Sequence, residues 1–316
     1  MIMALGWCVL ALAMLALGGD SVLKGASGLS RRFGWSPFVT GLLLVAFGTS
    51  IPELAVNARA FYTGSQNLAL GNAIGSNIVN FGLTLGLAAI VAPLLVRWRA
   101  LAPLLICLVV ATIALIALGY DGVLTRVEGL IFVVAFFVVV TFAAIRSRRE
   151  TPELQEEIAG FLMTSDGLGQ NLIRFAMGAV LLYFGAQWLV QHAPIVGTAW
   201  GMTPLLTGLI VVAIATALPE AAAAMSAARR GQGDMVVGHV IGSSLFNLLI
   251  VVGGMAALRD LPIPTSFVMF ELPAALAVCL LLYPMLRRDL QISRAEGWVL
   301  LISFIAWVVF EIMLSR

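Results

Sequence analysis

Charged residues are scarce in this sequence. Only 11% of the 316 residues are Asp, Glu, Lys or Arg, whereas 61% are apolar and the mean hydropathy is +1.05. A soluble globule of this length needs more polar residues to cover its surface. The composition therefore excludes a soluble protein and indicates an integral membrane protein. The arginines are scattered over short loops and form no patch, so we expect no nucleic-acid partner.

Cysteine is rare as well. Cys8, Cys107 and Cys279 each lie inside an apolar run, which argues against a disulfide framework and against a clustered thiolate metal site. The sequence also lacks the GxGD and HExxH signatures of membrane-embedded and zinc hydrolases. We expect no enzymatic activity and no cofactor, with an intramembrane hydrolase using paired carboxylates as the remaining enzyme alternative.

Apolar runs long enough to cross a bilayer, about twenty residues each, are abundant. They lie near residues 2–19, 37–61, 67–95, 101–119, 123–145, 171–191, 203–228, 235–257, 265–286 and 296–314. We predict an all-α membrane protein with ten transmembrane helices. The first five helices occupy residues 1–146, a polar cytoplasmic linker occupies 147–170, and the second five occupy 171–316.

The two halves contain related sequences. Residues 34–86 reappear without a gap as residues 201–253, so that GTSIPE is matched by ATALPE and GNAIGSNIVN by GHVIGSSLFN. The constant offset of about 167 residues pairs Glu53 with Glu220, Thr49 with Thr216, Ser76 with Ser243 and Asn80 with Asn247. Because five is odd, the second set of helices is upside down relative to the first. The sequence therefore predicts an inverted repeat, an organisation typical of secondary transporters.

Basic residues indicate the orientation of this arrangement. If both termini are extracytoplasmic, 14 of the 18 lysines and arginines fall on the inner side of the membrane. Only Arg59, Arg126, Arg259 and Arg316 then remain outside. Cytoplasmic loops of membrane proteins carry such an excess of positive charge. We therefore predict that both termini are extracytoplasmic.

Polar side chains collect on one face of each repeat. Helical spacing puts Ala46, Thr49, Ser50 and Glu53 on one face, and Pro52 frees a backbone carbonyl beside them. Pro219 does the same beside Thr216 and Glu220. A second stripe consists of Asn72, Ser76 and Asn80 in the first copy and of His239, Ser243 and Asn247 in the second. Brought together near the midplane, these groups predict an all-oxygen cage for a hard cation.

The two glutamates also indicate how such a cation would move. A carboxylate at the bilayer centre costs about 2.5–3.5 kcal/mol, and two close carboxylates repel each other. An empty site of charge minus two therefore resists occlusion, and only the loaded protein should change sides. That constraint favours exchange of one divalent ion for several monovalent ions or protons. An ion channel would not need a pair of uncompensated carboxylates that prevents the empty protein from changing sides, and it would pass the cation without any counter-ion.

GTSIPE and GNAIGSNIVN, together with their copies in the second half, resemble the paired motifs of the cation/calcium exchanger superfamily. The closest pattern is that of the compact bacterial calcium/sodium antiporters, and the resemblance covers nearly the whole chain. It implies a multi-pass protein of the bacterial inner membrane that exchanges calcium for sodium by alternating access. Calcium and sodium ions and the lipid bilayer would be its partners, with no required protein partner.

The resemblance also implies which residues bind the ions. Calcium would be bound by Glu53 and Glu220 together with Thr49 and Thr216. The sodium sites would add Ser50, Ser76, Ser243, the amides of Asn80 and Asn247, and the backbone carbonyls of Ala46 and Ala213.

The second copy departs from this pattern. Ala217 stands where Ser50 does, and His239 stands where Asn72 does. The departures keep open a proton-coupled or other-cation exchanger of the same fold, with His239 as a pH modulator because histidine titrates near neutrality. The alternative for His239 is a helix-end position facing headgroups or water. Outside the motifs, we expect Asp20 and Glu271, near span ends, to be solvated or paired with arginines.

Overall fold

The computed structural model describes residues 1–32, 50–96, 98–147 and 167–314. Nine helices in these residues are long and apolar enough to cross a membrane. Helix α3 (Ile51–Tyr62) is the described part of a further predicted span, residues 37–61, whose beginning lies outside the described residues. The prediction of an all-helical membrane protein with about ten apolar helices is thereby confirmed.

Two helices are much longer than the sequence predicts. Helix α1 spans Ile2–Arg32 and α9 spans Leu168–Ala199, against expected spans of 2–19 and 171–191. In α1 the helix continues past the apolar run, and there Asp20 and Lys24, one turn apart, form an ion pair at 2.7 Å. Asp20 is therefore paired, as expected, although with a lysine. Glu271 is 4% exposed, so the expectation that it is solvated is wrong. Apolar length alone underestimates helices that run beyond the hydrocarbon layer.

The other elements of the first half continue from α3 in an order that the second half repeats. They are α4 (Gln66–Val79), the π-helix η2 (Asn80–Thr84), α5 (Leu85–Val91), β1 (Leu94–Leu95), α6 (Trp98–Leu118), the 3-10 helix η3 (Gly119–Asp121), β2 (Val123–Leu124) and α7 (Arg126–Ser147). Helix α4 runs on through η2 into α5, so these three segments form one continuous span with a π-turn inside it.

In the second half, three further spans contain π-turns. The elements after α9 are α10 (Pro204–Leu206), η4 (Thr207–Val212), α11 (Ala213–Arg229), α12 (Gly233–Phe246), η5 (Asn247–Val252), α13 (Gly253–Leu258), β3 (Leu261–Pro262), η6 (Phe267–Glu271), α14 (Leu272–Asp289), β4 (Gln291–Ile292) and α15 (Arg294–Leu314). The π-turns η2 and η5 begin at the matched asparagines, Asn80 and Asn247. π-turns inside α-helices are frequent at functional sites.

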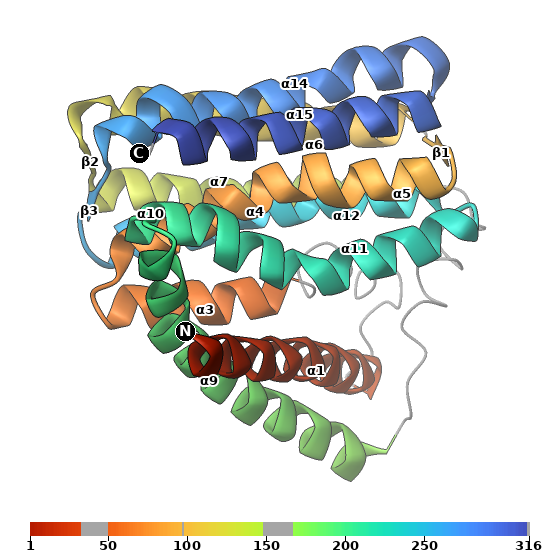
Figure 1. Ribbon diagram of the computed structural model, residues 1–316. Coiled ribbons are helices and arrows are strands. Elements are labelled where there is room, and N and C mark those ends of the chain that lie inside the picture. Colours follow the sequence, from red (N-terminus) through yellow and green to blue (C-terminus); the bar gives the residue numbers. More distant parts are fainter. Residues whose placement is uncertain (33–49, 97, 148–166, 315–316) are drawn as a thin grey trace.

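Short antiparallel strand pairs connect the two halves. Strand β1 pairs with β4 and β2 pairs with β3, each over two residues. Figure 1 shows the β1–β4 pair and the β2–β3 pair at opposite ends of the molecule, while α1 begins and α15 ends toward the same end. The order of the pairing shows that α6 and α14 run antiparallel, because the strand before each helix pairs with the strand after the other.

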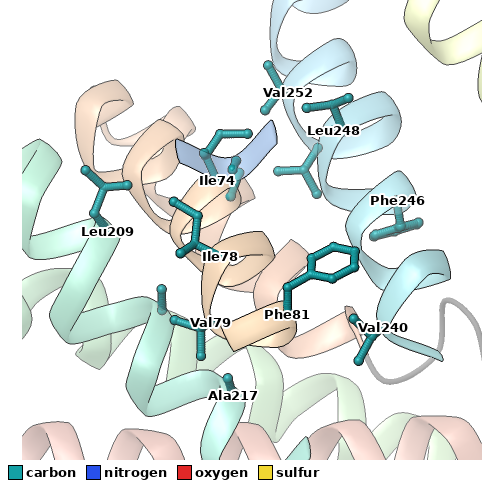
Figure 2. Packing of buried hydrophobic residues seen from close by; sticks show 14 of the residues in the cluster. Ile74, Ile78, Val79, Phe81, Leu209, Ala217, Val240, Phe246, Leu248 and Val252 are labelled. Atoms are coloured by element: carbon teal, nitrogen blue, oxygen red, sulfur yellow. The ribbon is translucent and has the colours of Figure 1, made fainter. Parts of the chain in front are cut away.

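The centre of the molecule is the span made by α4 and η2. Figure 2 shows Ile78 and Phe81 of this span between the helix that carries Leu209 and the helix that carries Val240. On the Leu209 side the backbones are very close, since a Cβ added at Gly75 would lie 2.7 Å from the Cα of Leu209 and collide with its carbonyl. Small residues allow such close packing of membrane helices. This contact places the polar stripe of α4 and η2 next to η4 and α11.

Candidate ion-binding site

The two matched glutamates lie together in the interior. Glu53, on α3, is 2% exposed, and Glu220, on α11, is 7% exposed. The two carboxylates interact electrostatically, and Thr216, one turn before Glu220, lies within hydrogen-bonding reach of Glu53. Glu53 Oε2 and both carboxylate oxygens of Glu220 have no hydrogen-bond partner among the described residues. Buried acceptors without donors demand a compensating cation or proton.

The serines and asparagines of the two stripes meet beside this pair. Ser50 Oγ and Ser243 Oγ share a hydrogen bond of 2.6 Å, and Asn80 donates from Nδ2 to Ser243 Oγ at 3.3 Å. Ser76 is 1% exposed, and its hydroxyl finds no partner in the described part of the chain. The structure therefore brings side chains from both halves into one polar cluster, as the sequence predicts.

The backbone around the two prolines differs between the halves. Pro52 lies in the first turn of α3, where a missing N–H costs no hydrogen bond, whereas α11 continues through Pro219 from Ala213 to Arg229. The irregular backbone of the second half lies earlier, in the π-turn η4. There the Thr216 hydroxyl donates to the carbonyls of Val212 at 3.0 Å and Ala213 at 3.3 Å. The expected sodium-ligand carbonyl of Ala213 thus contacts Thr216. Thr49 and Ala46 lie outside the described residues.

Sequence reasoning missed a second set of contacts between the halves. Asn247 donates from Nδ2 to Asn77 Oδ1 at 3.2 Å, and Asn77 donates to the Ser244 carbonyl at 3.2 Å. Asn77 and Ser244 are separated by 167 residues, the repeat offset, so equivalent positions touch each other. Asn77 follows Ser76 directly and therefore lies off the predicted stripe. Its amide among the apolar residues of α4, a helix that is buried from Leu68 to Val79, was the available signal.

Asn57 is another residue that the motifs did not single out. Its Oδ1 accepts a hydrogen bond from Asn72 Nδ2 at 2.9 Å, and both side chains are 0% exposed. Asn57 lies one turn after Glu53 on α3. Its counterpart in the second half is Ala224, so this amide pair exists only in the first half.

His239 occupies the place of Asn72 in the second half, and the structure places it at the site. Its Nε2 lies 3.7 Å from Glu220 Oε2, and the side chains are 11% and 6% exposed. The expectation that His239 faces headgroups or water is therefore wrong. His239 is largely enclosed here because α12 begins six residues earlier, at Gly233, and packs against α4, α6 and α11.

These donors suit hard cations. Carboxylate, amide, hydroxyl and carbonyl oxygens are the ligands of Ca²⁺ and of other hard ions, and the cluster contains no thiolate. The three cysteines are free, as predicted; Cys8 and Cys279 are buried and Cys107 is partly buried.

Comparison with known proteins identifies the architecture. The sequence profile of the family described as sodium/calcium exchanger protein matches residues 3–145 and 171–313. The chain belongs to this family. It is 30% identical to the inner membrane protein YrbG of Escherichia coli over 320 residues, which cover 100% of this chain and 98% of YrbG. It is 27% identical to the sodium/calcium exchanger MaX1 of Methanosarcina acetivorans, with 95% and 96% of the chains covered.

Solved structures of the sodium-calcium exchanger NCX_Mj share the fold. A structure of NCX_Mj soaked with Na⁺ and Sr²⁺ superimposes with a TM-score of 0.68 at 27% identity, covering 98% of each chain. The exchanger family suggested by the GTSIPE and GNAIGSNIVN motifs is thus confirmed, and so is the multi-pass membrane character. The matched relatives are transporters, and the prediction that this chain is not an enzyme is therefore confirmed.

Proposed function

We propose that this protein is a secondary active antiporter of the bacterial inner membrane that exchanges calcium for sodium. The observation that carries the proposal is the pair Glu53 and Glu220. The two carboxylates come from different halves of the chain, are almost completely buried and interact with each other, and three of their four oxygens have no hydrogen-bond partner among the described residues. A divalent cation neutralises this pair, and so do two monovalent cations.

The same pair supports alternating access with obligatory exchange. Without a cation the site carries two uncompensated charges in the bilayer interior, where even one costs about 2.5–3.5 kcal/mol. The empty protein therefore resists the step that occludes the site. Calcium leaving on one side must be replaced by sodium before the site can return.

The proposed ligand set has two parts. Calcium is bound by Glu53 and Glu220 with Thr49 and Thr216, and the reach of Thr216 to Glu53 supports this grouping. Sodium additionally uses Ser50, Ser76, Ser243, Asn80, Asn247 and the carbonyls of Ala46 and Ala213. The Ser50–Ser243–Asn80 cluster and the unpartnered Ser76 hydroxyl support the sodium ligands.

We also propose that residues 1–146 and 171–316 are inverted repeats, joined by a cytoplasmic linker at 147–170, with both termini extracytoplasmic. Two separate family matches, to residues 3–145 and 171–313, support the division. The β1–β4 and β2–β3 pairs support the inversion, because exchanging the two halves converts one pair into the other and the pairs lie at opposite ends of the molecule (Figure 1).

Radiolabelled calcium uptake into proteoliposomes tests the exchange. We expect an imposed sodium gradient to drive calcium uptake. Loss of a residue that only orients a metal ligand lowers activity by ~10- to 100-fold. Because Glu220 is itself a proposed ligand, we expect Glu220→Gln to lower calcium uptake by more than this. Glu128→Gln is the matched control, because Glu128 caps α7 at the exposed Thr125 and lies outside the site. Uptake that needs no sodium on the opposite side would identify a channel and contradict the proposal.

A proton-coupled or other-cation exchanger of the same fold is the second candidate. The approach of His239 Nε2 to Glu220 Oε2, at 3.7 Å, favours it, because a protonated imidazole supplies a positive charge to the carboxylate pair. Glu220 is an acidic group in contact with His239. Uptake driven by a pH gradient and not by sodium would select this candidate.

A further inference from the structure

Asn77 connects the two halves of the chain beside the proposed sodium ligand Asn247. Its Nδ2 donates to the Ser244 carbonyl and its Oδ1 accepts from Asn247 Nδ2, both at 3.2 Å. Asn77 is 4% exposed, and Ser244 and Asn247 are 0% exposed. Hydrogen bonds in such an interior are stronger than those exposed to water, so this chain of contacts holds its members firmly.

The orientation of the Asn77 amide follows from the chemistry of its partner. A backbone carbonyl can only accept a hydrogen bond, so the Asn77 NH2 group must face Ser244. The Asn77 oxygen then faces Asn247 and requires a donor there, which is the Asn247 NH2 group. Because the oxygen and nitrogen of an amide diverge, Asn247 Oδ1 points away from Asn77. One backbone carbonyl thus sets the direction of both amides.

The oxygen at the end of this chain of hydrogen bonds is available to a ligand. Asn247 Oδ1 is buried and has no hydrogen-bond partner among the described residues, and the same holds for Glu53 Oε2 and Ser76 Oγ. The π-turn η5, which begins at Asn247, packs against α3 and α4, the helices that carry Glu53 and Ser76. A buried oxygen without a donor is costly unless a cation or a water molecule compensates it.

The equivalent asparagine of the first half is held differently. Asn80 donates to Ser243 Oγ at 3.3 Å, and its Oδ1 accepts from the Thr84 hydroxyl at 3.5 Å. A hydroxyl group can donate as well as accept, so the Asn80 amide can turn over and keep both partners. The orientation that Asn77 imposes through a backbone carbonyl is therefore specific to Asn247.

We propose that Asn77 is a positioning residue for sodium, which holds the Asn247 amide with its oxygen, and not its NH2 group, toward the bound ion. The inference rests on the proposed function, which makes Asn247 a sodium ligand and gives Asn77 no role. An amide oxygen is a ligand that hard cations prefer, whereas an NH2 group carries only donors. Without Asn77 the Asn247 amide is free to turn, and part of the population presents its NH2 group to the ion.

The proposal predicts an effect on one ion only. Asn247 is among the proposed ligands of sodium and not among those of calcium, so loss of its orientation should weaken sodium binding and leave calcium binding unchanged. A residue needed only for helix packing would affect both ions, because α4 and η5 support the whole site.

Thermal unfolding of the purified protein in detergent tests this prediction. The unfolding temperature is measured at increasing sodium concentration, with choline keeping the ionic strength constant, and separately at increasing calcium concentration. A bound ion stabilises the folded protein by an amount that gives its dissociation constant. Residues that orient a metal ligand contribute ~10- to 100-fold in affinity, and we expect Asn77→Ala to raise the sodium dissociation constant within this range. The calcium dissociation constant should not change.

A double-mutant cycle shows whether Asn77 acts through Asn247. Asn247→Ala removes the ligand itself, so adding Asn77→Ala to it should cause no further loss of sodium binding. Thr112→Val is the matched control, because the buried Thr112 hydroxyl also donates to a backbone carbonyl, that of Leu108 at 2.8 Å, but within α6 and outside the proposed ligand set. This control should leave both dissociation constants unchanged.

Four outcomes would overturn the proposal. They are an unchanged sodium dissociation constant in Asn77→Ala, equal weakening of sodium and calcium binding, additive effects in the cycle, and a wild-type protein that sodium does not stabilise. Failure of sodium-driven calcium uptake by a wild-type protein that binds both ions would contradict the proposed exchange and not the role of Asn77 in binding. If Asn77→Ala does not fold, Asn77→Ser, which carries the residue of the equivalent position 244, replaces it.

Discussion

At the scale of single residues, Ser243 and Ser244 are adjacent but differ in what their hydroxyls do. Ser243 Oγ holds Ser50 and Asn80, whereas Ser244 Oγ has no partner among the described residues and only the Ser244 carbonyl is used, by Asn77. Ser243→Ala leaves buried polar groups unpaired, at about 1–3 kcal/mol of unfolding free energy. We expect a lower unfolding temperature in detergent and a higher sodium requirement for exchange.

Ser244→Ala is the matched control for this substitution. It removes an unpartnered hydroxyl and keeps the carbonyl that Asn77 uses, so we expect nearly wild-type stability and exchange. Equal effects of the two substitutions would show that the Ser243 hydroxyl has no special part in the site.

His239 provides a second residue-scale prediction. Replacing it by asparagine, the residue at the equivalent position 72, removes the titratable group beside Glu220 while keeping a polar side chain. If His239 modulates exchange, the pH profile of calcium uptake should flatten between about pH 5 and 8, the range in which histidine ordinarily titrates. An unchanged profile in His239→Asn would remove the pH role of this residue, whatever the driving ion.

The sequence predicted the members of the site better than their contacts. Glu53, Glu220, Ser243 and Asn80 were identified because polar residues repeat at one offset inside apolar helices, and Ser50 because it lies on the same helical face as Glu53. The partners Asn57 and Asn77 were not identified. Their contacts depend on which residues of a neighbouring helix lie opposite them. The periodic pattern within a single helix does not contain that information.

At the scale of elements, glycine determines how closely α4 approaches η4. A Cβ at position 75 would lie 2.7 Å from the Leu209 Cα, and this neighbour is backbone that cannot rotate away. Gly75→Ala should therefore destabilise the protein by about 1–3 kcal/mol, the usual range for overpacking. Thermal unfolding in detergent measures the effect.

Gly254→Ala is the control for this element. Gly254 lies in α13, and a Cβ there would meet nothing within 4 Å. The loss of backbone freedom then favours alanine by about 0.5–1 kcal/mol. Two substitutions of the same chemistry should thus shift the unfolding temperature in opposite directions, and a stabilising Gly75→Ala would contradict the close approach.

Element boundaries were less predictable than element existence. The apolar runs located the spans, but α1 extends to 31 residues because helix formation continues where the side chains become polar, and α9 extends to 32 residues because it continues through Pro194 to Ala199. The π-turns η2, η4, η5 and η6 have no signature in composition. They arise where neighbouring helices and side chains outside the local sequence stabilise an extra residue in a turn.

At the scale of the whole molecule, the repeat is symmetric in its ion-binding motifs and asymmetric around them. Glu53 and Glu220 match, while His239 and the Asn57–Asn72 pair each occur in one half only. The matched residues belong to the proposed ion-binding site, and the unmatched residues are positions at which the two halves can respond differently to pH or to the ion present.

The inversion of the two halves has a direct test in the turns after α3 and α11. Thr63 and Arg230 follow these helices at equivalent positions, and both are exposed. Ten spans with extracytoplasmic termini put Thr63 outside and Arg230 inside. In oriented membrane vesicles, a membrane-impermeant thiol reagent should label Thr63→Cys only from the extracytoplasmic side and Arg230→Cys only from the cytoplasmic side.

The wild-type protein is the control, since Cys8 and Cys279 are buried and Cys107 lies within α6. Labelling of both positions from the same side would mean that the halves are parallel repeats, and an odd number of spans per half would then be wrong.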